Sequence, residues 1–213
     1  MLISGNSRKT FFDTLRNSGL LWTLALVLTR FGFRALRFWP DRNISTKVLE
    51  DQVSEVLRAW GMAGEHIATT ARHIVYADLH GIDSHGCGML MHYHRQLRTN
   101  SITMTPKIVV VRESDTTAVI DGGGGLGHVP ADIAMQLAIE KCRDSGVAIV
   151  TVRNSGHFGA AGAYAAMAAQ SGLIGIAMTN VRTPALVPTG GLTAALGTNP
   201  IAFAAPARKN KPF

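Results

Sequence analysis

The sequence predicts an α/β (α+β) fold, in which a helical N-terminal domain precedes an α/β domain with a mixed sheet. Apolar residues recur at helical spacing from Leu49 to Leu97, whereas β-branched runs alternate with helical segments after Pro106. With 213 residues, 46% hydrophobic and 16% charged, the chain can bury a sizeable core. We therefore expect an N-terminal extension over residues 1–43, a helical domain over 44–105 and an α/β domain over 106–213.

The extension carries most of the excess positive charge. Residues 1–42 hold seven Arg or Lys against Asp13 and Asp41, while the remaining residues hold 14 bases and 12 acids. The body is thus nearly neutral, and it lacks the clustered basic face that binding to nucleic acid requires. We expect no nucleic-acid partner.

The apolar run Gly19–Leu28 lies between basic residues, and Arg30 ends it well short of the ~20 apolar residues of a membrane span. Such a segment suits an organelle transit peptide, a helix over residues 19–37 with weak membrane contact, or a stretch without function. Cys87 and Cys142 form no CxxC pair, which fits a reducing compartment. We expect a cytoplasmic protein, with organelle targeting or membrane association as the alternative.

Three helices are predicted in the helical domain. The first begins behind Ser45 or Thr46 as the cap and ends at Gly61, with a buried face of Leu49, Val53, Val56, Leu57 and Trp60. The second covers Glu65–Leu79 and the third Met89–Arg98. The polar segment ADLHGIDSHGCG, residues 77–88, connects these last two helices.

The α/β domain opens with two β-rich runs, KIVVVR and TTAVID. We then expect a helix over Ala131–Cys142, a strand over Val147–Val152, an alanine-rich helix over Gly159–Gln170 and a strand over Ile174–Met178. No internal repeat is visible.

Gly122, Gly124 and Gly127 match the pattern G-x-G-x-x-G between a strand and a helix, the context of a dinucleotide-binding loop. A run of this glycine content meets the pattern easily, and the next strand ends in Arg153-Asn154 without a ribose-binding acid. A glycine turn, a Rossmann phosphate loop and another type of cofactor contact all remain open.

Two histidines could act as the base that removes a hydroxyl proton, since imidazole suits this at neutral pH. His85 lies in a loop where Asp83 and Ser84 could fix its tautomer, and His157 lies between a strand and the N-terminus of a helix, which keeps imidazole neutral. For each, a structural histidine is the alternative. Three others are predicted to be surface or capping residues, namely His66, His73 and His128.

Imidazole and carboxylate groups near His85 also raise a metallohydrolase as an alternative, with zinc or iron bound by some of Asp78, His80, Asp83, His85, His92 and His94. His92 and His94 are two residues apart, so on a helix they point to different sides. We predict no metal.

Three blocks resemble the malate/L-lactate dehydrogenase family of NAD(P)-dependent 2-hydroxy acid oxidoreductases: ADLHGIDSHG, VRNSGHFGAAGAYAAMAAQSGLIGIAMTN and GTNPIAFAAP. They occur in the family's order over residues 44–206. The resemblance implies a non-Rossmann cofactor-binding domain, NAD or NADP as cofactor, a small 2-oxo or 2-hydroxy acid as substrate, and a homodimer.

Carried over by position, the resemblance implies acid or base roles for His85 and His157, with Ser84 and Asp83 beside them. It places Tyr93 and His85 at the substrate. It implies that the cofactor is bound by His157, Thr179, Asn180, Val181, Thr198, Asn199 and Pro200.

Two positions depart from the family pattern, because Met89 and His80 stand where the resemblance implies arginines. An arginine at the first position would suit a substrate carboxylate. The family also continues past PIAFAAP, so we expect a truncated chain in which strand Ile174–Met178 lacks sheet partners and exposed apolar surface favours association. A non-catalytic remnant or binding module is the alternative function.

Overall fold

The computed structural model describes residues 43–181 and 183–210. The predicted targeting or membrane role of the extension, including Gly19–Leu28, falls outside the described residues. The described residues from Ile44 onward belong to one compact unit, and the boundary predicted between residues 105 and 106 lies inside it. Within the described part of the chain, no helix is both long and apolar enough to cross a membrane.

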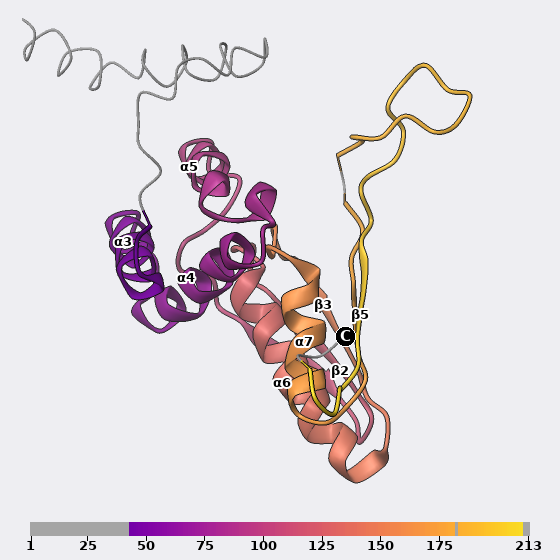
Figure 1. Ribbon diagram of the computed structural model, residues 1–213. Coiled ribbons are helices and arrows are strands. Elements are labelled where there is room, and N and C mark those ends of the chain that lie inside the picture. The colour runs from indigo at the N-terminus through magenta and orange to yellow at the C-terminus, as the bar shows by residue number, and fades with distance from the viewer. Residues whose placement is uncertain (1–42, 182, 211–213) are drawn as a thin grey trace, which may run out of the picture. The chain divides into compact units, whose positions relative to one another are not determined.

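The three predicted helices are present as α3 (Thr46–Ala59), α4 (Gly64–Leu79) and α5 (Leu90–Arg98) (Figure 1). Most of their ends lie within one residue of the predicted ends. The predicted cap is confirmed, because the Ser45 hydroxyl accepts a hydrogen bond from the Val48 backbone N–H at 3.3 Å. These helices and the glycine turn enclose the main apolar core, which consists of Val53, Leu57, Met62, Ile67, Ala71, Ile74, Val75, Tyr93, Ile102, Met104 and Leu126.

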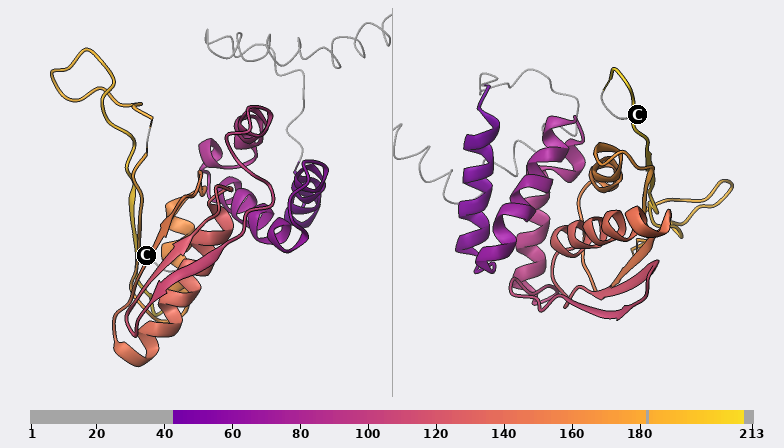
Figure 2. Two further views of the ribbon diagram at one scale, coloured as in Figure 1. Left: turned by 180° about the vertical axis from the view of Figure 1, so that it is seen from behind. Right: turned by 90° about the horizontal axis from the view of Figure 1, so that it is seen from below.

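The strands β1 (Val109–Glu113), β2 (Thr117–Asp121) and β3 (Ile149–Arg153) form one sheet in this order. β1 is antiparallel to β2, whereas β2 is parallel to β3, so the predicted mixed sheet is confirmed. The helix α6 (His128–Ser145) makes the crossover between the parallel pair and lies along the sheet (Figure 2).

α6 begins at His128, one turn earlier than the predicted start at Ala131. Pro130 does not delay the helix, because residues of the first turn have no intrahelical partner for their N–H groups and proline has none to offer. At the other end Gly146 adopts a left-handed φ of 78° and its N–H bonds to the Cys142 carbonyl, which ends the helix.

The turn Gly122–Gly127 is packed against its own chain. A Cβ on Gly123 would lie 2.7 Å from the Lys107 carbonyl oxygen, and one on Gly127 would lie 2.5 Å from that of Gly156. The backbone N–H groups of Gly122, Gly124 and Gly127 donate to the carbonyls of Arg153, Asn154 and His157. A phosphate loop needs such N–H groups free for its ligand. The structure therefore favours the glycine turn among the three interpretations.

The strand β4 (Gly175–Met178) pairs antiparallel with β5 (Ile201–Ala204), so the expectation that β4 lacks a sheet partner was wrong. The segment between them leaves the strands and returns, joined by a bridge between Leu186 and Leu196 (Figure 1). The helix α7 (Ala161–Gln170) packs on both strands. The pair still exposes apolar side chains, namely Ile176, Met178, Ile201 and Phe203.

Candidate active site

His85 ends the short 3-10 turn η1 (Asp83–His85), which is followed by a second turn, η2 (Cys87–Met89). Its Nδ1 shares a hydrogen bond of 2.9 Å with the Ser84 hydroxyl, as the sequence predicts for a residue that could fix its tautomer. The Asp78 carboxylate lies close against Gly86, because an added Cβ would be 1.7 Å from Asp78 Oδ1 and would displace this side chain. The other Asp78 oxygen accepts from the Cys87 backbone N–H at 2.9 Å, which braces the loop.

His157 lies in the loop between β3 and α7, and the glycine turn holds this loop in place. Gly127 N–H donates to the His157 carbonyl and Gly156 N–H to the Gly125 carbonyl, both at 2.8 Å. Gly159 has a φ of 77° and its N–H donates to His157 Nδ1 at 3.3 Å. The glycine turn therefore positions a predicted site residue.

Three predicted site residues come together, although 64 residues separate His157 from Tyr93 in sequence. Tyr93, fully buried on α5, has its hydroxyl 2.7 Å from His157 Nδ1. The rings of His85 and His157 are 5.2 Å apart between centroids. The two imidazoles therefore lie side by side, next to the buried hydroxyl of Tyr93.

His128 is a further member of this cluster, and the prediction that it is a surface or capping residue was wrong. Its ring is fully buried at the start of α6, with Nε2 3.5 Å from the Tyr93 hydroxyl. The same prediction fails for His66 and His73, which are also buried. Nothing in the local sequence distinguishes these buried histidines except that His128 directly follows the glycine turn.

A buried carboxylate joins α4 to α6 beside this cluster. Asp132 Oδ1 accepts from His73 Nε2 at 2.6 Å and from an Arg72 guanidinium N–H at 2.7 Å. The Gln136 amide donates to its other oxygen. The His73 ring in turn packs on Tyr164, with centroids 4.6 Å apart. No sequence pattern pointed to this cluster, because about 60 residues separate its members on α4 from those on α6.

Burial sets the protonation of the cluster. It lowers the pKa of His157 to about 4, with the charges of His85 and His92 acting in the same direction. Burial, with His73 and His157, also lowers the pKa of His128 well below its ordinary value. For Tyr93, burial raises the pKa well above the usual range. His157, His128 and Tyr93 are therefore all uncharged at neutral pH.

We expect the free energy of unfolding to decrease as the pH falls from about 6.5 to about 4. In this range the unfolded chain protonates His157 while the folded chain does not, so protons favour unfolding. Above about pH 6.5 the stabilisation that comes from the lowered pKa of His157 is fully present. Urea denaturation at several pH values should show this slope in the wild type and a smaller one in His157→Gln; equal slopes would contradict the prediction.

Apart from His157, the residues predicted to bind the cofactor lie on two adjacent segments, one that follows β4 and one that precedes β5. Thr179 N–H donates to the Pro200 carbonyl at 3.3 Å, and Val181 N–H to the Asn199 side-chain oxygen at 2.8 Å. The structure thus brings Thr179–Val181 beside Thr198–Pro200. Among the described residues, no hydrogen bond, ion pair or ring contact joins them to His157. Asp83 is exposed, and none of these contacts joins its carboxylate to His85.

The ligands considered for a metallohydrolase point to different neighbours. His94 stacks on Trp60 and His80 on Tyr76, with ring centroids 5.4 and 3.9 Å apart. Asp78 is occupied by the loop backbone. In the part of the chain that the structure describes, no three His, Cys, Asp or Glu residues converge where they could hold a metal ion.

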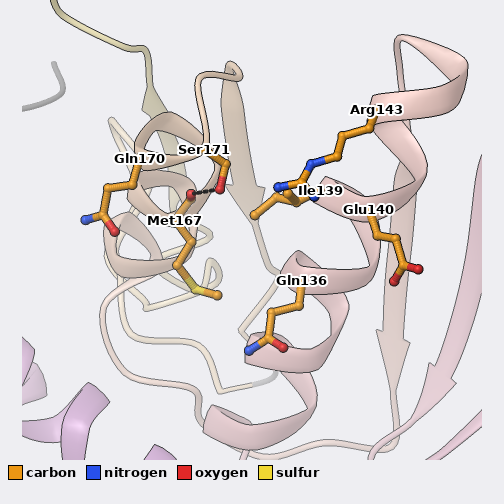
Figure 3. A pocket seen from close by; sticks show the side chains of 7 residues that line it. All are labelled: Gln136, Ile139, Glu140, Arg143, Met167, Gln170 and Ser171. Atoms are coloured by element: carbon orange, nitrogen blue, oxygen red, sulfur yellow. Dashed lines mark hydrogen bonds between the residues drawn. The ribbon is translucent and has the colours of Figure 1, made fainter.

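A groove of about 490 Å³ runs between α6 and α7, and Gln136, the partner of Asp132, is among the residues that line it (Figure 3). Its walls carry Glu140 and Arg143 from α6 and Met167 and Gln170 from α7. None of the predicted site residues lines it, so it is not the candidate active site.

Comparison with known proteins connects this arrangement to one family. The family model described as malate/L-lactate dehydrogenase matches residues 44–213. The malate dehydrogenase of Pyrococcus horikoshii is 48% identical over 161 residues, which cover 76% of this chain and 44% of that protein. The ureidoglycolate dehydrogenase (NAD(+)) of Escherichia coli O157:H7 is 36% identical over 164 residues, covering 77% and 47%.

The solved structure of malate dehydrogenase from Pyrococcus horikoshii OT3 superposes with a TM-score of 0.75 and 45% identity, over 81% of this chain and 49% of that one. The matched residues therefore share the fold of the corresponding half of that malate dehydrogenase. The chain spans about half the length of the curated relatives it matches.

Proposed function

This chain belongs to the malate/L-lactate dehydrogenase family, and we propose that it carries the proton-transfer groups of an oxidoreductase that moves a hydride between NAD(P) and a small 2-hydroxy or 2-oxo acid. The observation that most supports this is the convergence of His85 and His157, whose rings are 5.2 Å apart, beside the buried hydroxyl of Tyr93. Because the chain spans half of its relatives, the proposal concerns the protein of which this chain is the matching part.

The proposed reaction needs a hydride at the carbonyl carbon and a proton at the carbonyl oxygen of a 2-oxo acid. A reduced nicotinamide supplies the hydride when it is bound. Two imidazoles that reach one oxygen meet the second requirement, because a proton donor acts within about 2.6–3.2 Å of the atom it protonates. Tyr93 holds the ring of His157 in place through the hydrogen bond to Nδ1.

The segments Thr179–Val181 and Thr198–Pro200 fit a nicotinamide cofactor in their chemistry. The Asn199 side-chain oxygen accepts from the Val181 backbone N–H, and this bond holds the two segments together. Asn199 itself has a φ of 39°. Asn180 and Thr198 are exposed, and their amide and hydroxyl groups suit the carboxamide, ribose and phosphate groups of a dinucleotide. We propose that these two residues, with Thr179, hold NAD or NADP.

The test is oxidation of NADH and NADPH with pyruvate, oxaloacetate and 2-oxoglutarate, using this chain extended at its C-terminus with the second half of a relative. We expect turnover with at least one acid, and a rate lower by about 10²–10⁴ in the His85→Ala/His157→Ala double variant. Cys142→Ala is the control, because this half-buried thiol lies in the last turn of α6 and is not one of the residues predicted for the site. Equal rates in the wild type and the double variant would refute the proposal.

A binding module without turnover is the second candidate, and Met89 favours it. This side chain packs against the apolar core of the helices, at the position where an arginine would suit a substrate carboxylate. Calorimetry with NADH on the 213-residue chain separates the candidates in part: micromolar binding supports a cofactor site, whereas turnover in the assay above excludes a mere binding module.

A further inference from the structure

The Nδ1 atom of His157 faces two groups, and one of them can only donate. The Gly159 backbone N–H points at this nitrogen from 3.3 Å. A backbone N–H has no acceptor capacity, so Nδ1 must offer its lone pair and cannot carry a proton. A neutral imidazole carries one proton, which therefore resides on Nε2.

The Tyr93 hydroxyl must then donate as well, because its partner at 2.7 Å is the same unprotonated Nδ1. This leaves the phenolic oxygen as an acceptor. His128 Nε2 can donate to this oxygen from 3.5 Å, the length of a weak hydrogen bond.

His128 completes the direction of this chain of hydrogen bonds. The ring is fully buried, and its Nδ1 is a buried atom that has no partner among the described residues. Nδ1 of His128 is therefore unpartnered in either tautomer, as a donor or as an acceptor, and both are costly. Only the Nε2–H tautomer lets this ring donate to Tyr93. The order is thus His128 Nε2–H to Tyr93 Oη–H to His157 Nδ1.

We propose that Tyr93 and His128 are positioning residues that hold His157 as the neutral Nε2–H tautomer, so that His157 donates a hydrogen bond to the substrate oxygen and His85 exchanges the proton. The assignment of roles rests on the proposed function. In the reduction, a reduced nicotinamide would supply the hydride for the new C–H bond, and the carbonyl π electrons would move to oxygen. The His85 imidazolium gives that oxygen its proton and becomes neutral.

His157 then resembles a neutral histidine that polarises a carbonyl and never takes up the proton itself. His85 is suited to the other role, since it is only half-buried and its Nδ1 is held by the Ser84 hydroxyl, which leaves Nε2 for the substrate. The other titratable side chains facing His157 are His92 and His128, from α5 and α6.

The tautomer can be measured without turnover. Long-range 1H–15N correlation spectra of the 213-residue chain labelled with 15N-histidine should show His157 with a protonated Nε2 and an unprotonated Nδ1 at neutral pH. His157→Gln identifies the signals. A protonated Nδ1 at neutral pH would overturn the proposal, even in an active protein. The predicted tautomer in a protein without dehydrogenase activity would refute the proposed function alone.

The positioning role is tested through the same signals. Tyr93→Phe and His128→Leu should shift the His157 Nδ1 resonance, because each interrupts the chain of donors, while His128→Gln, whose amide can still donate to Tyr93, should restore most of it. Tyr76→Phe, on α4 and outside the chain, is the control. If His128→Leu does not fold, Tyr93→Phe alone decides. An unshifted Nδ1 resonance in Tyr93→Phe would show that Tyr93 does not hold the tautomer.

Conservative substitutions in the extended, active protein distinguish the roles of the two imidazoles. A glutamine at position 157 keeps an N–H donor but is no base. One donor to a developing oxyanion raises the rate by about 10²–10³, so we expect His157→Gln to be at least roughly ten times as active as His157→Ala. His85→Gln should be as inactive as His85→Ala. Equal activities of His157→Gln and His157→Ala would overturn the assigned roles.

Discussion

Replacing Asp132 by alanine is expected to lower the free energy of unfolding by about 3–5 kcal/mol. The carboxylate is only 4% exposed and accepts hydrogen bonds from His73, Arg72 and Gln136. Its removal leaves the His73 side chain, itself 5% exposed, without the partner that offsets its burial. Urea denaturation followed by circular dichroism measures the change.

Asp51→Ala is the matched control. Asp51 also pairs with a cation, Lys47, but the two side chains are 60% and 76% exposed, so the loss should stay within about 0–1 kcal/mol. If Asp132→Ala were as mild as Asp51→Ala, the buried cluster would not be what joins α4 to α6.

The effect of Asp132→Ala should also depend on pH. Burial raises the pKa of Asp132, but the hydrogen bond and charge of His73, with Arg72, outweigh it and leave the pKa below its ordinary value of 3.8. A lowered carboxyl pKa stabilises the folded state above the unfolded pKa, and this stabilisation is lost as the pH falls through the folded pKa. The difference between wild type and Asp132→Ala should therefore narrow below about pH 4.

Gly175→Ala is expected to separate β4 from α7. An added Cβ would lie 2.2 Å from the Ala165 carbonyl oxygen and 2.9 Å from Ala168 Cβ, and the first of these is backbone that cannot rotate away. Overpacking of this kind costs about 1–3 kcal/mol and more where backbone must move, so we expect the upper end or beyond. The β4–β5 pairing should be lost with it, because Gly175 pairs with Ala204.

Amide hydrogen exchange of β4 and β5, together with thermal unfolding, measures this change. Gly162→Ala is the control, since this glycine is inside α7 and an added Cβ meets nothing within 4 Å. Alanine there should be neutral or stabilise the helix by up to about 1 kcal/mol. Unchanged exchange in Gly175→Ala would show that the contact between α7 and β4 tolerates a side chain.

The helices of the N-terminal part could be predicted from the sequence because their signals are local. The apolar spacing and the Ser45 cap act within a few residues, and the structure reproduces them. The short strand Ile201–Ala204 was missed, because four residues after a proline carry little periodicity and only pairing with β4 makes them a strand. The partner of β4 was therefore missed too.

By itself, the sequence determined the family and the two histidines of the candidate site, because His85 and His157 lie in local glycine-rich motifs whose loops are short. The tertiary structure alone decided what surrounds them. Tyr93 meets His157 across 64 residues, His128 meets Tyr93 across 35, and Asp132 meets His73 across 59. Such contacts depend on how α4, α5 and α6 pack, and burial created by that packing makes His128 and His157 neutral. No local pattern encodes that burial, and for this reason the sequence placed His128 on the surface.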